Sequence, residues 1–253
     1  MNTARSALSL ILDFEAIKFG AQPLVSDYMR GVHNLNPPQP RYLKLWDPNI
    51  VLTLLCKWSP AKKLTLRKLT LKTLMLILLT TGIRLDTIHK LTLDNSEIKA
   101  SCMQFETHNI NKQSRMGYKD PVLKIKAYPP DRRLCVFTYL KVYLARTAKI
   151  RNGEKRLFVT YQKPVHQASR DSLSRWTKAV LKEAGLDTNI FSAHSVRGAS
   201  ATAASLGGAN IEEILESAGW SNTQTFAKFY NKPLLDKKQL AYDTAILSRM
   251  RKN

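Results

Sequence analysis

Residues 191–202 read Phe-Ser-Ala-His-Ser-Val-Arg-Gly-Ala-Ser-Ala-Thr, and residues 218–230 read Ala-Gly-Trp-Ser-Asn-Thr-Gln-Thr-Phe-Ala-Lys-Phe-Tyr. The first stretch places His194 and Arg197 three positions apart, so one face of a helix would present both side chains. The second stretch carries Trp220 and Tyr230. Glycines and a capped helix separate the two stretches, and such breaks allow the second to fold back toward the first.

A third stretch lies far upstream and reads Leu79-Thr-Thr-Gly-Ile-Arg84. Residues 70–80 are apolar almost all round, which predicts a buried helix that ends at Thr81-Gly82. Arg84 then falls at the start of the next short helix, directly after a buried element. We therefore expect the backbone at Arg84 to be rigid.

Each of these side chains alone has an ordinary structural explanation. His194 and Arg197 could form a solvated helix face, Tyr230 could pack, and Trp220 could anchor a core or a surface. Arg84 could cap its helix or pair with Asp86. The combination on one chain favours a functional site over five separate structural roles.

The charge of the chain supports a polyanionic partner. Its 253 residues include 40 Lys and Arg against 19 Asp and Glu, a formal net charge of +21. Nucleic acid is the commonest such partner, although a ribosomal or merely soluble basic protein could have the same balance. A hydrophobic content of 44% is enough for one substantial core and a small accessory domain.

Cysteines and apolar runs point to a soluble intracellular protein. Cys56, Cys102 and Cys135 are widely spaced, which indicates small buried side chains in a reducing compartment. The most apolar stretch, residues 73–83, is too short to cross a bilayer, and residues 1–12 make a poor signal or transit peptide.

The pattern along the chain predicts an α+β fold that is mainly α-helical and contains a small antiparallel β-sheet. Residues 1–44 form a partial N-terminal helical segment and a Pro-rich linker, and residues 45–253 form the main domain. Alternation at 103–106 and 123–127 indicates two strands joined by a polar turn at 111–117. A short strand is possible at 156–160. The first of the other expected helices begins at Pro48 and covers 48–57. The remaining ones cover 134–148, 172–184, 193–205, 211–217, 223–230 and 234–250.

The three quoted stretches resemble the conserved boxes of tyrosine recombinases, a family similar to phage integrases. The resemblance covers roughly residues 45–235, and the three boxes stand in the family's order. Together with Arg132-Arg-Leu-Cys-Val, their wording looks closest to eukaryotic mobile-element recombinases of the DIRS and Crypton kind. The resemblance implies a tyrosine recombinase catalytic domain, preceded by a remnant like the family's core-DNA-binding domain.

The resemblance also implies roles. Tyr230 matches the nucleophile, Arg84 and Arg197 match the pair that clamps the scissile phosphate, and His194 matches the acid/base histidine. Trp220 stands where many relatives carry His and some carry Trp. Lys112 best matches the lysine of the family's β-hairpin, with Lys119, Lys124 and Lys126 as alternatives.

Two departures from the family pattern concern geometry and DNA binding. The interval from Trp220 to Tyr230 is one residue longer than in most bacterial relatives, which puts the shape of the cleft in question. By the same resemblance we expect the N-terminal DNA-clamping domain to be incomplete, which puts independent DNA binding in question.

These residue types suit phosphodiester chemistry without a metal or another cofactor, and the sequence shows neither a phosphate-binding glycine loop nor a metal-ligand cluster. Two guanidiniums can bind the non-bridging oxygens and gain strength as charge builds in the transition state. A tyrosine phenol, with an ordinary pKa of about 10, needs help to ionise. The expected product is a 3′-phosphotyrosine, and a lysine ammonium can protonate the leaving 5′-hydroxyl.

The expected partner is double-stranded DNA, bound by a homo-oligomer, with no membrane partner. Residues 234–250 could dock on a neighbouring subunit or pack on their own domain. Further basic side chains are candidate phosphate contacts, while an ordinary solvated face explains about half of them equally well. The candidate DNA-binding residues are Lys62, Lys63, Arg67, Lys68, Lys124, Lys126, Lys141 and Arg175.

The sequence therefore predicts an enzyme that cleaves and rejoins DNA at specific sites, for integration of a mobile element, acting in the nucleus. The alternatives are an inactive, domesticated DNA-binding protein with the same fold and a DNA relaxer like type IB topoisomerases. A ribosomal RNA binder is disfavoured because no aromatic platform on a sheet is evident.

Overall fold

The computed structural model describes residues 22–37, 39, 41–106, 122–220, 223–230 and 232–234. The chain divides into two compact units, residues 1–41 and residues 42–253. In the first unit, Pro23 occupies the first turn of helix α2 (Pro23–Leu35), a position where its missing N–H costs no hydrogen bond. No residue of α2 is buried. Residues 1–21, for which a helix was also predicted, lie outside the described residues.

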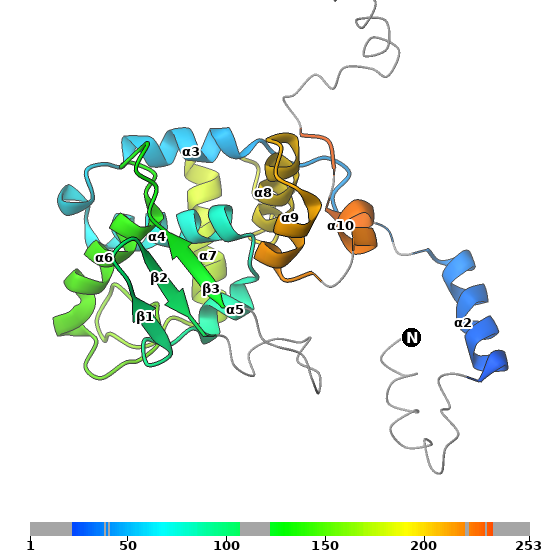
Figure 1. Ribbon diagram of the computed structural model, residues 1–253, viewed down its shortest axis with the longest axis horizontal. Coiled ribbons are helices and arrows are strands. Elements are labelled where there is room, and N and C mark those ends of the chain that lie inside the picture. Colours follow the sequence, from blue (N-terminus) through cyan, green and yellow to red (C-terminus); the bar gives the residue numbers. More distant parts are fainter. Residues whose placement is uncertain are drawn as a thin grey trace, which may run out of the picture. The chain divides into compact units, whose positions relative to one another are not determined.

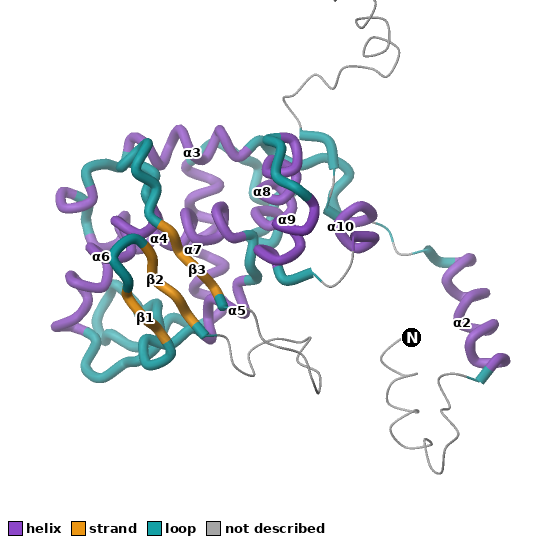
Figure 2. Tube along the Cα trace, viewed as in Figure 1, coloured by secondary structure: helices purple, strands orange, loops and turns teal. Residues whose placement is uncertain are grey.

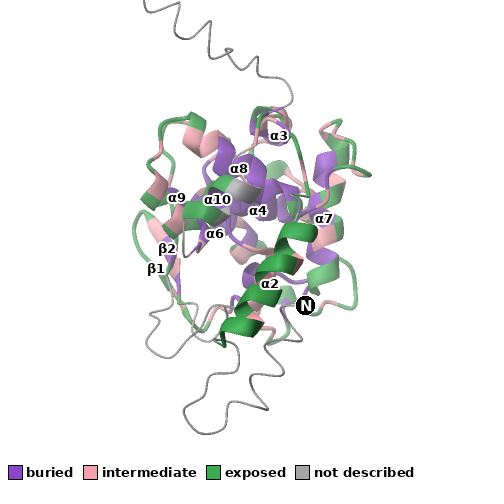
Figure 3. Cartoon of the chain, turned by 90° about the vertical axis from the view of Figure 1, so that its right-hand side faces the viewer, coloured by how far each residue is buried: buried purple, intermediate pink, exposed green. Residues whose placement is uncertain are grey.

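Helix α4 (Leu66–Thr81) forms the centre of the second unit. It contacts α6 (Val136–Thr147), α7 (Arg170–Glu183) and α8 (Ser195–Leu206), and every residue from Leu69 to Leu78 is buried (Figures 1 and 3). The helix begins before the predicted Thr70, because the Thr65 side chain accepts the backbone N–H of Lys68 and caps it. The predicted buried helix that ends at Gly82 is confirmed.

Helix α3 (Pro48–Lys57) begins where the sequence predicted. The Asp47 carboxylate accepts the backbone N–H of Asn49 at 3.0 Å, and Pro48 follows as the first helical residue. A short 3₁₀ turn, η2 (Ala61–Lys63), connects α3 to α4.

The sheet has three antiparallel strands in the order β1-β2-β3 (Figure 2). These are β1 (Ser96–Ile98), β2 (Cys102–Phe105) and β3 (Leu123–Lys126). The predicted small sheet is confirmed, and β1 is an addition that its short, exposed sequence did not signal. Met103 pairs with Ile125 on the buried face, while Lys124 and Lys126 are exposed. The predicted turn at 111–117 lies outside the described residues.

The segment at 156–160 is not a strand of the sheet. Among the described residues it forms isolated bridges, from Thr92 to Arg156 and from Val159 to Gln167. The guanidinium of Arg151 donates to the backbone oxygens of Arg156 and Leu157 at 2.6 and 2.8 Å, so these groups are satisfied by a side chain rather than by a sheet partner. The turn η3 (Ala148–Ile150) precedes Arg151.

The helices after α7 surround the candidate site. Helix α8 is followed by α9 (Ile211–Ala218) and α10 (Thr223–Phe229). Asn210 and Glu213 form the predicted capping box at the start of α9. A second, smaller apolar cluster joins these helices and contains Ala201, Ile214, Ala218, Trp220 and Phe226.

The second unit is thus mainly helical with one small antiparallel sheet, as the sequence predicted. The helix predicted at 234–250 lies outside the described residues, apart from Leu234. Within the described ranges, none of the helices has both the length and the apolar character needed to span a membrane.

Candidate active site

Arg197 lies at the centre of the site, on the first turn of α8, with only 3% of its surface exposed. Its Nη1 donates to the backbone oxygens of Gly82 and Ala218, at 2.6 and 2.7 Å. These two oxygens belong to the C-terminal ends of α4 and α9. The guanidinium is therefore held by two helix ends that are far apart in the sequence.

Two glycines make these helix ends possible. Gly82 and Gly219 follow α4 and α9 with φ values of +62° and +67°, in the left-handed region that other residues adopt only at a cost. The Ser217 hydroxyl also donates to the backbone oxygen of Thr81 at 2.8 Å, which ties the end of α9 to the end of α4. The two helices therefore end together beside Arg197.

Trp220 stacks on the same guanidinium. The guanidinium carbon of Arg197 lies 4.1 Å from the indole centroid, a distance that fits a cation–π contact. The indole in turn packs against Tyr230, with ring centroids 4.5 Å apart, and against Phe226 at 5.6 Å. Trp220 is 7% exposed, so the site has a largely dry wall.

Three buried N–H donors in this site have no hydrogen-bond partner among the described residues. They are Nε and Nη2 of Arg197 and Nε1 of Trp220. A buried donor without an acceptor costs about 1–3 kcal/mol, so native structures seldom leave three together. An oxyanion within reach of the free edge of the guanidinium and of the indole N–H would satisfy them.

Arg84 supplies the second positive charge. It precedes helix α5 (Leu85–Lys90), whose first hydrogen bond runs from the Ile88 N–H to the Arg84 oxygen at 3.1 Å. Burial, and after it the charge of Arg84, lower the pKa of Arg197 to about 10. Asp86 pairs with Lys90 at 2.9 Å and not with Arg84. The two positive charges therefore repel each other, Tyr230 offsets this only in part, and among the described residues no carboxylate forms an ion pair with either arginine.

Tyr230 and His194 meet beside the Arg197 guanidinium. The Tyr230 hydroxyl lies 3.3 Å from Nε2 of His194, and the two rings meet edge to face. His194 is exposed at the first end of α8, whereas the half-buried Tyr230 ring has its centroid 5.6 Å from the Arg197 guanidinium carbon. A proton can pass between the phenol and the imidazole at this separation, with small adjustment.

The backbone of Tyr230 is fixed from α8. The Thr202 hydroxyl donates to the Tyr230 oxygen at 2.6 Å, and the N–H of Lys232 reaches the same hydroxyl oxygen at 3.4 Å. Tyr230 follows directly after α10, and its N–H donates to the Phe226 oxygen at 2.9 Å. The longer interval between Trp220 and Tyr230 therefore does not keep the phenol away from the site.

The structure brings together five of the six residues for which the sequence suggested catalytic roles: Arg84, His194, Arg197, Trp220 and Tyr230. Lys112 lies outside the described residues. The sequence reasoning missed Thr202 and the oxygens of Gly82 and Ala218. The glycine after each helix could have indicated the two oxygens. Such a glycine marks the C-terminal end of a helix, where the last carbonyl oxygens have no partner within the helix.

The residues suggested for DNA binding lie on several elements. Most are exposed, whereas Lys68 is half-buried over the Trp58 ring and pairs with Glu183 at 3.8 Å. They are spread over η2 (Lys62, Lys63), α4 (Arg67, Lys68), β3 (Lys124, Lys126), α6 (Lys141) and α7 (Arg175). Their role stays a prediction. In the described part of the chain, no three His, Cys, Asp or Glu side chains gather as metal ligands would.

Comparison with known proteins identifies the fold of this site. The sequence profile of the phage integrase family matches residues 59–235. XerA recombinase is 16% identical to the chain, with a TM-score of 0.57, and the similarity covers 99% of this chain and 80% of XerA. The integrase of the Tn1549 transposon (residues 82–397, Y379F), in complex with transposon right-end DNA, is 17% identical, with a TM-score of 0.51 and coverage of 99% and 78%.

XerH recombinase, bound to its palindromic difH substrate in a post-cleavage complex, is 15% identical with a TM-score of 0.54. The similarity covers 72% of this chain and 48% of XerH, so the chain spans about half the length of that recombinase. At these identities the likeness establishes the fold, which is that of a tyrosine recombinase catalytic domain. No curated protein matches the sequence.

Proposed function

We propose that this chain, which belongs to the phage integrase family, cuts and rejoins DNA through a covalent 3′-phosphotyrosine intermediate. One observation carries the proposal. Three buried donors of Arg197 and Trp220 have no partner in the described structure, and they lie beside a phenol that contacts an imidazole. A phosphodiester oxygen is an acceptor that would satisfy these donors and lie within reach of the phenol.

The cations of the site would bind and activate the phosphate. Arg197 would donate from Nε and Nη2 to non-bridging oxygens, and Trp220 would add one N–H from the wall. Arg84, whose charge already affects Arg197, would neutralise the other side. Such donors bind more strongly as charge develops in the five-coordinate transition state, and loss of one typically costs on the order of a hundredfold in rate.

The bond changes balance without any external energy source. The Tyr230 oxygen attacks phosphorus and gives up its proton, which His194 is placed to accept. The P–O5′ bond breaks as the Tyr–O–P bond forms, and the 5′-oxygen takes a proton from a general acid, the role we assign to Lys112. The reverse sequence, with the 5′-hydroxyl of the same or another strand as nucleophile, rejoins DNA and releases Tyr230.

The wording of the sequence boxes suggests a recombinase of the DIRS or Crypton kind, and a transposon integrase shares the fold, so we assign the chain to integration of a mobile element. Exchange between two duplexes needs more than one nucleophile, so the active form would be a homo-oligomer on double-stranded DNA. A recombinase of a eukaryotic mobile element would act in the nucleus, which imaging of a fluorescent fusion would test.

The test must work without a known target sequence. A pool of DNA duplexes with randomised flanks, each carrying one 5′-bridging phosphorothiolate, would be incubated with the protein. Attack by Tyr230 expels a 5′-thiolate that religates poorly, so the adduct accumulates and survives denaturation. Sequencing of the trapped DNA then reports the preferred site, and tryptic mapping reports the modified residue.

We expect an adduct at Tyr230 from the wild-type protein and none from Tyr230→Phe. Tyr128→Phe is the matched control, because Tyr128 is an exposed tyrosine of the same unit and should leave the yield unchanged. An equal yield from Tyr230→Phe would overturn the assignment. Salt-sensitive DNA binding without any adduct would favour an inactive binding protein, and relaxation of plasmids by monomers would favour a topoisomerase-like enzyme.

A further inference from the structure

The chain enters the second unit alongside the segment that leaves Tyr230. The N–H of Leu45 donates to the oxygen of Pro233 at 2.8 Å, and Leu45 and Leu234 form a parallel bridge. Both leucines are buried, with 1% and 4% exposure. Tyr42–Trp46, the first five residues of the second unit, therefore form the entry segment, which lies next to the outgoing end of the nucleophile segment.

The side chain of Leu45 packs on α8 at Gly198. A Cβ added to Gly198 would lie 3.1 Å from one Leu45 methyl group and 3.6 Å from Cδ1 of Tyr230. The Leu45 side chain and the Tyr230 ring therefore both approach Gly198, where the α8 backbone carries no side chain. A shift of Leu45 would change the space available to the ring.

Two further bonds join the entry segment to the residues that flank His194. The Trp46 indole N–H donates to the Ser195 hydroxyl oxygen at 2.9 Å, and both residues are fully buried. The hydroxyls of Tyr42 and Ser192 lie 2.7 Å apart, and the Tyr42 ring packs on Phe191. Ser192 and Ser195 are themselves linked by a backbone hydrogen bond of 2.9 Å. The turn that carries His194 is thus held on both sides.

We propose that Tyr42, Leu45 and Trp46 are positioning residues that set the separation and orientation of His194 and Tyr230. One short segment contacts both halves of that pair, through Ser192 and Ser195 on one side and through Pro233, Leu234 and Gly198 on the other. The proposal rests on the proposed function for its catalytic consequence. Its geometric part, the placement of the phenol against the imidazole, stands independently.

A merely structural role would be expected of any buried tryptophan, so the experiment must separate stability from positioning. Trp46→Phe keeps most of the packing and removes the bond to Ser195, and Ser195→Ala removes the same bond from the other partner. Trp176→Phe is the matched control, since Trp176 is a buried tryptophan on α7 that packs on Tyr161 and takes part in none of the entry-segment bonds described above. Tyr42→Phe tests the bond to Ser192.

The first measurement is the single-turnover rate of adduct formation on the duplex recovered from the phosphorothiolate pool, with DNA affinity measured in parallel. We expect Trp46→Phe and Ser195→Ala to slow adduct formation by about 10-fold or more, because displacements of about 1 Å cost that much or more in oriented reactions. DNA affinity should change less than twofold. The two variants should not be additive, since they remove one bond.

The second measurement does not need activity. Fluorine NMR of 3-fluorotyrosine placed at position 230 reports the surroundings of the phenol in the free protein. The resonance should shift or broaden in Trp46→Phe, Ser195→Ala and Tyr42→Phe, and it should stay in place in Trp176→Phe. Unfolding midpoints, measured for all variants, identify any that have lost the fold.

The outcomes separate the two proposals. If the resonance shifts in the entry-segment variants but the wild-type protein forms no adduct, the positioning role is supported and the proposed function is refuted. A wild-type adduct whose rate and resonance are the same in Trp46→Phe, Ser195→Ala and Tyr42→Phe would sink the positioning role and leave the function standing. Equal losses in Trp176→Phe and Trp46→Phe, each in proportion to lost stability, would also overturn the positioning role.

Discussion

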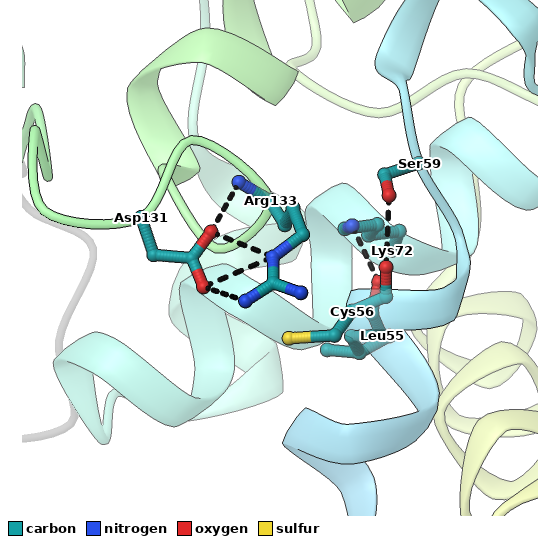
Figure 4. Close-up of polar contacts among 6 residues, drawn as sticks. All are labelled: Leu55, Cys56, Ser59, Lys72, Asp131 and Arg133. Atoms are coloured by element: carbon teal, nitrogen blue, oxygen red, sulfur yellow. Dashed lines mark hydrogen bonds and ion pairs between the residues drawn. The ribbon is translucent and has the colours of Figure 1, made fainter.

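Raising the pH from 7 to 9.5 should stabilise the second unit, because Lys72 is buried in its charged form at neutral pH. Lys72 lies on α4 with 0% of its surface exposed. Its Nζ donates to the backbone oxygens of Leu55 and Trp58, at 2.5 and 2.7 Å, and lies 3.9 Å from the centre of the Tyr139 ring (Figure 4 shows Lys72 beside Leu55). The ammonium thus caps the C-terminal end of α3, where carbonyl oxygens carry partial negative charge.

These contacts do not fully replace water. Burial is the main cause that lowers the pKa of Lys72 from 10.5 to about 8, against smaller opposing effects of Cys56 and Asp131. The Asp131 carboxylate is engaged by Arg133, at 2.8 Å between its Oδ2 and Nη2 of Arg133 (Figure 4). Lys72 therefore has neutral acceptors rather than a carboxylate partner.

The sign and the size of the effect follow from linkage. A lysine whose pKa is lower in the folded state releases its proton first from the folded protein, so stability rises as the pH passes through 8 toward 10.5. A pKa of about 8 against 10.5 makes the full effect about 3 kcal/mol, of which about 2 kcal/mol is gained by pH 9.5. Burial raises the pKa of Tyr139 to about 12, and its opposing contribution is only about 0.2 kcal/mol at pH 9.5.

Urea unfolding followed by tryptophan fluorescence would measure this, since all four tryptophans lie in the second unit. The free energy of unfolding is compared between wild type and Lys72→Met from pH 7 to 9.5, so that other titrating groups cancel. The difference should move by about 2 kcal/mol in favour of wild type. Lys68→Met is the control, because that side chain is 41% exposed and stays hydrated. A difference that is flat, or that moves the other way, would refute the reasoning.

Three further predictions concern the reaction. Lys112→Ala should slow cleavage of an ordinary nicked duplex by on the order of 100-fold. The 5′-bridging phosphorothiolate should restore its rate, because the thiolate leaves without a proton. If the phosphorothiolate instead rescues an Ala variant at Lys119, Lys124 or Lys126, that lysine is the general acid. Gly198→Ala should slow adduct formation, because the new methyl group presses on Leu45 beside Tyr230. The unfolding free energy should change by less than about 1 kcal/mol, because alanine favours a helix. An unchanged rate would contradict this. A mixture of Tyr230→Phe and Arg197→Ala should form no adduct, since His194 and Tyr230 meet within one chain; an adduct on a denaturing gel would mean that neighbours supply the tyrosine.

Much of the fold followed from local signals. Asp47-Pro48, Gly82 and the Asn210 capping box each mark a helix end, and the structure places helix ends there. Errors came where tertiary contacts decide. The segment at 156–160 has strand-like residues, but Arg151 binds its carbonyls. No feature of the sequence predicted that Lys72 is buried, because its burial depends on the meeting of α3 and α4.

The candidate site divides in the same way. Sequence order and family resemblance were enough to select Arg84, His194, Arg197, Trp220 and Tyr230, which the structure brings together. They could not show which donor atoms remain unpaired, because that depends on the angles at which two glycine-ended helices meet Arg197. Nor could they show the entry segment, since contacts between Trp46 and Ser195 or Leu45 and Pro233 join positions with no shared sequence pattern.

The way Arg197 is held bears on what it can bind. Within the described part of the chain its guanidinium contacts backbone oxygens and aromatic rings, and no carboxylate pairs with it. A carboxylate would have stabilised the buried charge, but it would also have neutralised it and competed with a phosphate for Nε and Nη2. Carbonyl oxygens orient the group through Nη1 and leave its net charge intact. The lowered pKa of Arg197 and its unpaired donors are therefore two results of one arrangement, which is costly in the free protein and favourable once an oxyanion is bound.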